Sequence, residues 1–109
     1  MTLDQFDVAA TPFPFADGPD VKLRPAVVLS TRAFNEFGMT VMAMVTSAKH
    51  SKMPGDVVLD YQAAGLPHPC MARLKIFSID NRLIEEWLGE MAEKDRASLT
   101  RELRRFLPF

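Results

Sequence analysis

The chain has 109 residues, of which 48% are hydrophobic and 25% charged, and its formal net charge is −1. These values are typical of a small globular protein, and they exclude a protein that binds nucleic acid through its overall charge alone. No apolar run approaches the roughly 20 residues of a membrane span, and the acidic first residues exclude a signal peptide, so we expect one domain over residues 1–109, in the cytoplasm.

Residues 5–79 have the pattern of short strands separated by turn residues. The predicted strands cover residues 7–15, 25–30, 39–46, 56–59 and 73–79. The first of them contains Pro12 and Pro14, whose missing N–H groups put its second half at a sheet edge or outside the sheet. The stretch 49–55 is polar and predicts a loop.

Residues 81–107 have helical patterns. Between residues 81 and 89, four apolar side chains have the spacing of one helical face, and Gly89 suits the end of that helix. These side chains are Leu83, Ile84, Trp87 and Leu88. A second helix is predicted over residues 93–106, where Ala92 provides a weak N-cap that costs about 1 kcal/mol. Short strands followed by terminal helices indicate a mostly β (α+β) fold, a small barrel of about five to seven strands with one or two C-terminal helices.

The signatures of familiar catalytic sites are missing from the sequence. The glycines do not have the spacing of a phosphate-binding loop, and neither an HExxH nor a Gly-x-Ser-x-Gly motif occurs. His50 and His68 belong to no His-rich cluster, and Cys70 is the single cysteine, so we expect no metal site and no cofactor. We interpret each histidine as a surface or loop residue and Cys70 as a buried small side chain.

The middle of the chain is locally basic. Five basic side chains and one acidic side chain between residues 22 and 52 give this segment a charge of +4 before any histidine is counted. Within it, Arg24 stands directly before a proline at the start of a predicted buried strand, which holds its backbone extended. Thr46 and Ser47 end the next buried strand, where hydroxyl side chains commonly form turns. From the residues alone, we favour Arg24 as an exposed arginine at a strand start.

Seven short segments, spread over nearly the whole chain, form a recognisable series. They are residues 7–8, 12–17, 24–30, 45–47, 56–59, 64–66 and 75–80. In order and spacing these segments resemble the MazF/PemK growth-inhibitor family, whose fold is an SH3-like barrel with a C-terminal helix. The chain departs from that family at Phe6, because a glycine commonly precedes the aspartate at this point.

The resemblance implies a metal-independent endoribonuclease whose catalytic residues are Arg24, Thr46 and Ser47. In such enzymes the ribose 2′-OH attacks the adjacent phosphate and leaves a 2′,3′-cyclic phosphate and a 5′-OH end, so the protein supplies charge stabilisation and proton transfer. Arg24 would neutralise the phosphorane, and Thr46 would hold the scissile phosphate in line. The candidate RNA-binding residues are Asp17, Lys22, Lys49, His50, Arg73 and Lys75.

The resemblance also implies partners. These are single-stranded RNA such as messenger RNA, a second copy of the chain in a homodimer, and an antitoxin whose disordered tail binds the basic groove; no membrane is involved.

Two other functional classes stay open from the sequence. CcdB-like toxins use a similar barrel to poison DNA gyrase without cutting nucleic acid, and the apolar residues 106–109 would suit such binding. A catalytically inactive barrel that serves only as an interaction module is the third class.

Overall fold

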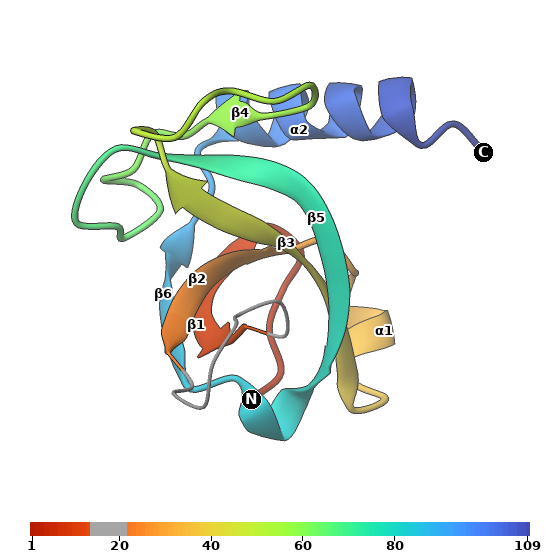
Figure 1. Ribbon diagram of the computed structural model, residues 1–109. Helices are drawn as coiled ribbons and strands as arrows, with labels where there is room; N and C mark the ends of the chain where they lie inside the picture. The colour runs from red at the N-terminus through yellow and green to blue at the C-terminus, as the bar shows by residue number, and fades with distance from the viewer. Residues whose placement is uncertain (14–21) are drawn as a thin grey trace.

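The computed structural model describes residues 1–13 and 22–109, and these residues form a six-stranded antiparallel sheet that curls into a half-barrel (Figure 1). The strands are β1 (Asp7–Pro12), β2 (Leu23–Val28), β3 (Met39–Ser47), β4 (Val57–Val58), β5 (Cys70–Asp80) and β6 (Glu86–Glu90), in the spatial order β4-β5-β3-β2-β1-β6. The helical elements are α1 (Arg32–Asn35), the 3₁₀ turn η1 (Asn81–Leu83) and α2 (Glu93–Phe106). This arrangement confirms the predicted mostly β barrel with one or two C-terminal helices, and the described residues form one main helix there, α2.

The sheet curls because its ladders contain irregularities. Two neighbouring pairs of the ladder between β3 and β5 are Ala43 with Ile76 and Val45 with Ala72. Residues 73–75 of β5 therefore face a single residue of β3, and extra residues on one strand bend it and increase its twist. Figure 1 shows the result as the long, strongly curved ribbon of β5. A second irregularity, between β1 and β6, lies at the other end of the sheet.

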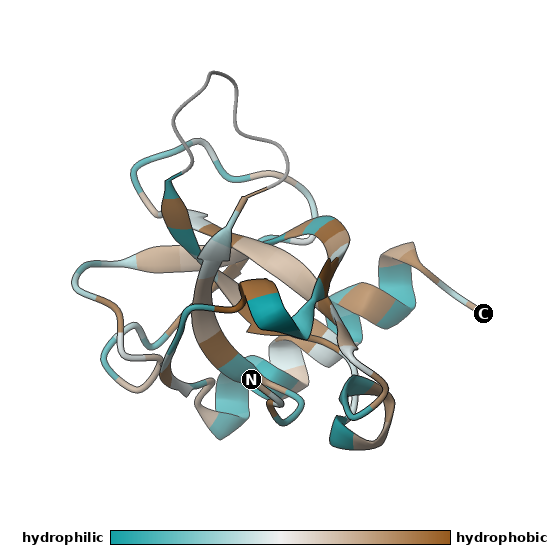
Figure 2. Ribbon diagram, turned by 90° about the horizontal axis from the view of Figure 1, so that it is seen from below, coloured by the Kyte–Doolittle hydropathy of each residue, from teal (hydrophilic) through white to brown (hydrophobic). Residues whose placement is uncertain are grey.

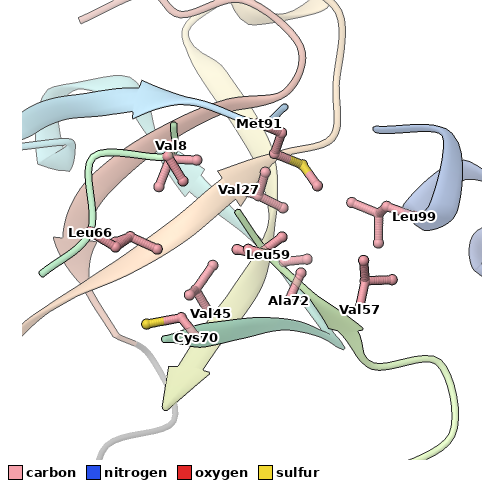
Figure 3. Close-up of a cluster of buried hydrophobic side chains, with 12 residues drawn as sticks. Val8, Val27, Val45, Val57, Leu59, Leu66, Cys70, Ala72, Met91 and Leu99 are labelled. Atoms are coloured by element: carbon pink, nitrogen blue, oxygen red, sulfur yellow. The ribbon is translucent and has the colours of Figure 1, made fainter. Parts of the chain in front are cut away.

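The central strands are buried on both faces. The cluster on one face contains Val8, Val27, Val45, Leu59 and Ala72, and the cluster on the other contains Ala9, Ala26, Val28 and Met42. Met91 and Leu99 point from the C-terminal segment into the first cluster (Figure 3). In the second cluster, the Phe13 and Phe77 rings meet edge to face with their centroids 5.3 Å apart. Burial on both faces explains the apolar runs 25–28 of β2 and 41–45 of β3. Figure 2 shows hydrophobic stretches of ribbon in the middle of the molecule.

The predicted helix over residues 81–89 is wrong. The chain makes one 3₁₀ turn, η1, and then enters β6, which pairs with β1. Asn81 sets this turn, because its buried amide oxygen accepts a hydrogen bond from Thr40 Oγ1 at 2.7 Å and its Nδ2 donates to the Asn35 carbonyl at 2.7 Å. Of the four apolar residues expected to share a helical face, only Ile84 is buried. The spacing is helical, but β1 offers unpaired backbone groups along its edge, and pairing them outweighs the local pattern.

The helix predicted over residues 93–106 is confirmed as α2. As expected, Ala92 makes no side-chain capping hydrogen bond. The buried carboxylate of Asp95, in the first turn, accepts a hydrogen bond from the Asp60 N–H at 2.7 Å, and this contact ties the helix to the connection between β4 and β5. No helix of the described residues is long and apolar enough to cross a bilayer.

Phe6 occupies the position where the family that the sequence resembles commonly has glycine. Its φ is 70°, in the left-handed region that favours glycine. Two backbone hydrogen bonds fix this conformation, from the Phe6 N–H to the Val28 carbonyl at 2.7 Å and from the Met91 N–H to the Phe6 carbonyl at 3.0 Å. The Arg96 guanidinium lies 5.8 Å from the centroid of the Phe6 ring and adds a cation–π contact. The chain therefore keeps the backbone of a glycine position while carrying an aromatic side chain.

Gly65 is required where the connection before β5 crosses β6. Its φ is 73°, and a Cβ at this position would collide with the Leu88 carbonyl, whereas Gly38, with a φ of 107°, has open space around it. We expect Gly65→Ala to lower the free energy of unfolding by about 3 kcal/mol, because a collision with backbone adds to the strain of a positive φ. Gly38→Ala should cost only about 1 kcal/mol. Urea unfolding followed by tryptophan fluorescence measures both losses, and equal losses would contradict the close approach of Gly65 to β6.

Candidate active site

A cavity of about 390 Å³ opens at the end of the sheet where β2 begins and β3 ends. Its walls come from the start of β2, the end of β3 with the turn that follows it, and the connection that leads into β5. The lining residues are Lys22, Leu23, Arg24, Pro25, Val45, Thr46, Ser47, His50, Leu66, Pro67, His68 and Cys70. The cavity therefore brings together five residues singled out from the sequence, which are Lys22, Arg24, Thr46, Ser47 and His50.

The pairing of β2 with β3 explains why Arg24 and Thr46 share this cavity. The two strands are antiparallel, and Ala26 lies opposite Met44. Extending this register by two residues toward the cavity puts Arg24 across from Thr46, and residues opposite each other in a ladder point to the same face. The neighbouring strands are in line with this pair. Thr11 of β1 lies opposite Arg24, and Met71 of β5 lies opposite Thr46.

The Arg24 guanidinium is available to a ligand. It makes no ion pair or hydrogen bond with residues 1–13 or 22–109, whereas the side chains of Arg73, Arg82 and Arg96 all pair with carboxylates. Its side chain is exposed at the mouth of the cavity. A guanidinium keeps its charge at any working pH and offers a planar set of donors that matches two oxygens of a phosphate.

The two hydroxyl residues have different surroundings. Thr46 is 9% exposed, and its hydroxyl has no hydrogen-bond partner in the described part of the chain, so it can donate to a ligand in the cavity. The Ser47 hydroxyl accepts a hydrogen bond from the Lys49 N–H at 3.2 Å, and the Ser47 carbonyl accepts from the His50 N–H at 3.1 Å. Ser47 therefore shapes the turn that brings His50 to the cavity.

The lining of the cavity is basic. Its ionisable side chains include Lys22, Arg24 and the two histidines, and no acidic residue of the described chain belongs to it. A cavity of this composition attracts an anion, and its polar groups suit the phosphate of a nucleic acid. Among the described residues, no three His, Cys, Asp or Glu side chains gather as ligands for a metal ion.

Arg73 lies elsewhere, in an ion pair with Asp56. Its Nη2 is 2.9 Å from Asp56 Oδ2 and also donates to the Ser51 carbonyl at 2.9 Å. Burial by itself raises the pKa of Asp56, but hydrogen bonds from Arg73 and Met53 and the nearby positive charges outweigh it, so the pKa of this carboxyl lies below its usual value. The hydrogen bond to Asp56 raises the pKa of Arg73. Arg73 thus anchors the loop between β3 and β4.

Two of the other residues predicted to bind RNA, Lys49 and Lys75, are not among the cavity lining. Lys49 is exposed in the turn after β3, and Lys75 is exposed on β5, in the stretch that bends away from the regular ladder. Asp17 lies outside the described residues.

His68 and Cys70 line the cavity, although the sequence pattern assigns neither of them a role in a site. His68 Nδ1 lies 3.3 Å from the Pro69 carbonyl and 3.6 Å from Cys70 Sγ, and the thiol donates to the His68 carbonyl at 3.2 Å. Burial raises the pKa of the Cys70 thiol, which disfavours a nucleophilic thiolate. His68 lies at the cavity because Cys70, two residues later, pairs with Ser47 at the end of β3. No local sequence pattern reveals this pairing.

Comparisons with known proteins give one family and a consistent fold. A family model described as PemK-like, MazF-like toxin of type II toxin–antitoxin system matches residues 4–107. A search of curated proteins finds no match.

Several solved structures have the same fold as this chain. MazF from Deinococcus radiodurans is 24% identical, with a TM-score of 0.79 and coverage of 100% of this chain and 99% of that one. An endoribonuclease from a mycobacterial species, solved in complex with its cognate antitoxin, is 15% identical, with a TM-score of 0.78 and coverage of 98% of both chains. The Mycobacterium tuberculosis toxin MazF-mt6 is 14% identical, with a TM-score of 0.75 and coverage of 91% and 93%.

The Asp56–Arg73 pair should make the fold sensitive to acid. We expect Asp56→Asn to lower the free energy of unfolding at pH 7 by about 3 kcal/mol, because it leaves a largely buried guanidinium without its carboxylate. Since the pKa of Asp56 is lowered in the folded protein, its contribution is complete above the ordinary carboxyl pKa of about 4 and is lost as the pH falls through the folded-state value. The stability of the unmodified protein should therefore fall more steeply below about pH 4 than that of the variant.

Urea unfolding at a series of pH values measures both effects. Glu90→Gln is the control, because Glu90 is paired with Arg96 but is mostly exposed, and its loss should be about 0.5 kcal/mol. Parallel pH profiles for Asp56→Asn and the unmodified protein would contradict this account of the pair.

Proposed function

The chain belongs to the PemK-like, MazF-like toxin family of type II toxin–antitoxin systems, and from this premise we propose that it is an endoribonuclease that cleaves single-stranded RNA. The observation that carries the proposal is the meeting of Arg24 and Thr46 in one basic cavity. Two structural neighbours, both endoribonucleases from mycobacterial species, support the same activity.

The chemistry that suits this cavity is attack by the ribose on its own phosphodiester. The 2′ oxygen forms a bond to phosphorus, the bond from phosphorus to the 5′ oxygen breaks, and the products are a 2′,3′-cyclic phosphate and a 5′-OH end. Arg24 stabilises the negative charge that develops on the phosphorane, because its planar set of donors matches two non-bridging oxygens. Thr46 donates a hydrogen bond that holds the phosphate in line with the attacking oxygen. Since the nucleophile belongs to the substrate, the proposed reaction needs no metal ion.

The remaining basic residues bind the RNA strand in this proposal. Lys22 and His50 line the same cavity and contact the RNA backbone at or beside the scissile phosphate. Lys49 and Lys75 are exposed and are proposed to contact the strand farther away. Arg73, which is paired with Asp56, supports the RNA-binding loop through Ser51.

The proposed partners follow from the charge of the cavity and from the neighbours. The MazF of Deinococcus radiodurans is also described in complex with MazE, and the mycobacterial endoribonuclease with its cognate antitoxin. We propose that a cognate antitoxin inserts a disordered acidic tail into the basic cavity and so competes with RNA. The toxin is proposed to act as a homodimer in the cytoplasm.

Arg24→Ala should lower RNA cleavage at least about 100-fold, because removing a donor aimed at the developing charge typically costs two to three orders of magnitude. Thr46→Ala should lower cleavage about 10-fold or more, since a neutral hydrogen bond contributes less than a charged one. Incubation of a long, unstructured RNA with each purified protein in EDTA, followed by gel electrophoresis and end analysis, measures the rates and the cyclic phosphate.

Arg104→Ala is the matched control, because Arg104 is exposed on α2 and is not part of the cavity. It should cleave at the unmodified rate. RNA that stays intact with the unmodified protein, or cleavage that Arg24→Ala leaves unchanged, would overturn the proposed nuclease. Growth arrest that persists in cells expressing Arg24→Ala would favour a gyrase-poisoning toxin. The exposed apolar side chains of Phe106, Leu107 and Phe109 would suit such a binding function.

A further inference from the structure

Both histidines of the chain converge on the cavity that holds Arg24 and Thr46. The chain has 2 histidines, and they belong to different connections, His50 to the one after β3 and His68 to the one before β5. The ladder explains the convergence, because Ser47 lies opposite Cys70, and each histidine stands just beyond this last pair. Both side chains line the cavity.

The proposed cleavage needs two proton transfers that Arg24 and Thr46 perform poorly. A proton must leave the 2′-OH as its oxygen attacks, and a proton must reach the 5′ oxygen as its bond to phosphorus breaks. A guanidinium is too weak an acid, and a hydroxyl too weak a base, to carry these protons near neutral pH. No carboxylate of the described chain lines the cavity, so the two imidazoles are its groups suited to both tasks.

The surroundings of His68 fit the task of a base. Its Nδ1 lies 3.3 Å from the Pro69 carbonyl, which can only accept a hydrogen bond, so the proton of a neutral ring belongs on Nδ1. The nearby Cys70 thiol uses its own proton in the hydrogen bond to the His68 carbonyl. This arrangement leaves Nε2 with a free lone pair that can take up a proton.

We propose that His68 is the general base and His50 the general acid of the RNA cleavage, an inference that rests on the proposed nuclease function. His68 Nε2 takes the proton of the 2′-OH while the 2′ oxygen bonds to phosphorus. His50 gives its proton to the 5′ oxygen as that oxygen leaves with the electron pair of the broken bond. Arg24 balances the charge of the phosphorane between these steps, and exchange of protons with water restores both rings after the products leave.

A sulfur substitution in the substrate separates the two roles. The probe is a short RNA that spans a cleavage site mapped with the unmodified protein, made once with the natural linkage and once with sulfur in place of the bridging 5′ oxygen. A thiolate leaves without being protonated, so the sulfur substrate needs a base but no acid. We expect His50→Ala to lower kcat on the natural RNA by about 100-fold or more and to cleave the sulfur substrate within a few-fold of the unmodified protein. We expect His68→Ala to be slow on both substrates by about 100-fold or more.

Two control variants change exposed residues outside the cavity. Gln62→Ala changes an exposed residue of the connection that carries His68, and Arg104→Ala changes an exposed residue of α2. Both should keep the unmodified kcat on both substrates. Because His50 and His68 are exposed, their variants should fold, and circular dichroism with thermal unfolding checks this.

The possible results distinguish this inference from the nuclease proposal. If the unmodified protein cuts RNA and Arg24→Ala abolishes cutting, but either histidine variant keeps more than about a tenth of kcat on the natural RNA, the nuclease stands and the acid–base pair is overturned. If the sulfur substrate does not rescue His50→Ala, or rescues His68→Ala, the assigned roles are overturned. If the unmodified protein cuts no RNA, both proposals fail.

Discussion

The register of β3 decides what faces the cavity. This strand is hydrogen-bonded to β2 on one side and to β5 on the other, and its last residues, Thr46 and Ser47, pair with the first residues of β5. Side chains alternate along a strand, so a slip of one residue would turn Thr46 away from Arg24 and move the buried Met42 and Ala43 to the wrong faces. Because both faces of β3 are packed, the core that stabilises the fold also fixes the geometry of the candidate site.

The histidines lie in connections, yet their positions depend on the same ladders. His50 follows a turn that the Ser47 carbonyl closes, and the next part of its loop is held where Arg73 binds the Ser51 carbonyl and Asp56. On the other side of the cavity, His68 directly precedes the start of β5. An ion pair outside the cavity thus restricts the loop that supplies one of its walls. Sites whose residues are held by strands and anchored loops keep the positions that catalysis needs.

The distribution of charge over the molecule matters more than its net charge. The net charge of −1 gives no sign of nucleic-acid binding, but the described lining of the cavity is basic and free of carboxylates. Two arginines have opposite surroundings, because Arg73 is paired with Asp56 whereas Arg24 has no acidic partner in the described residues. Leaving this guanidinium without an acidic partner among the described residues costs little while it is exposed, and in the proposed function it is the group that binds the phosphate.

The sequence by itself determined the features that depend on near neighbours: the buried strands, the polar loop after β3, the final helix and the series of short motifs that indicates the family. It also singled out Arg24 and Thr46, whose roles in catalysis stay predictions. Only the tertiary structure decided that residues 86–90 form a strand, that Arg73 pairs with Asp56, and that His68 joins the cavity. The reason is physical, because each of these depends on a partner distant in the chain. The edge of β1, the buried carboxylate of Asp56 and the cavity wall that carries His68 form only when the sheet folds. No local sequence pattern predicts them.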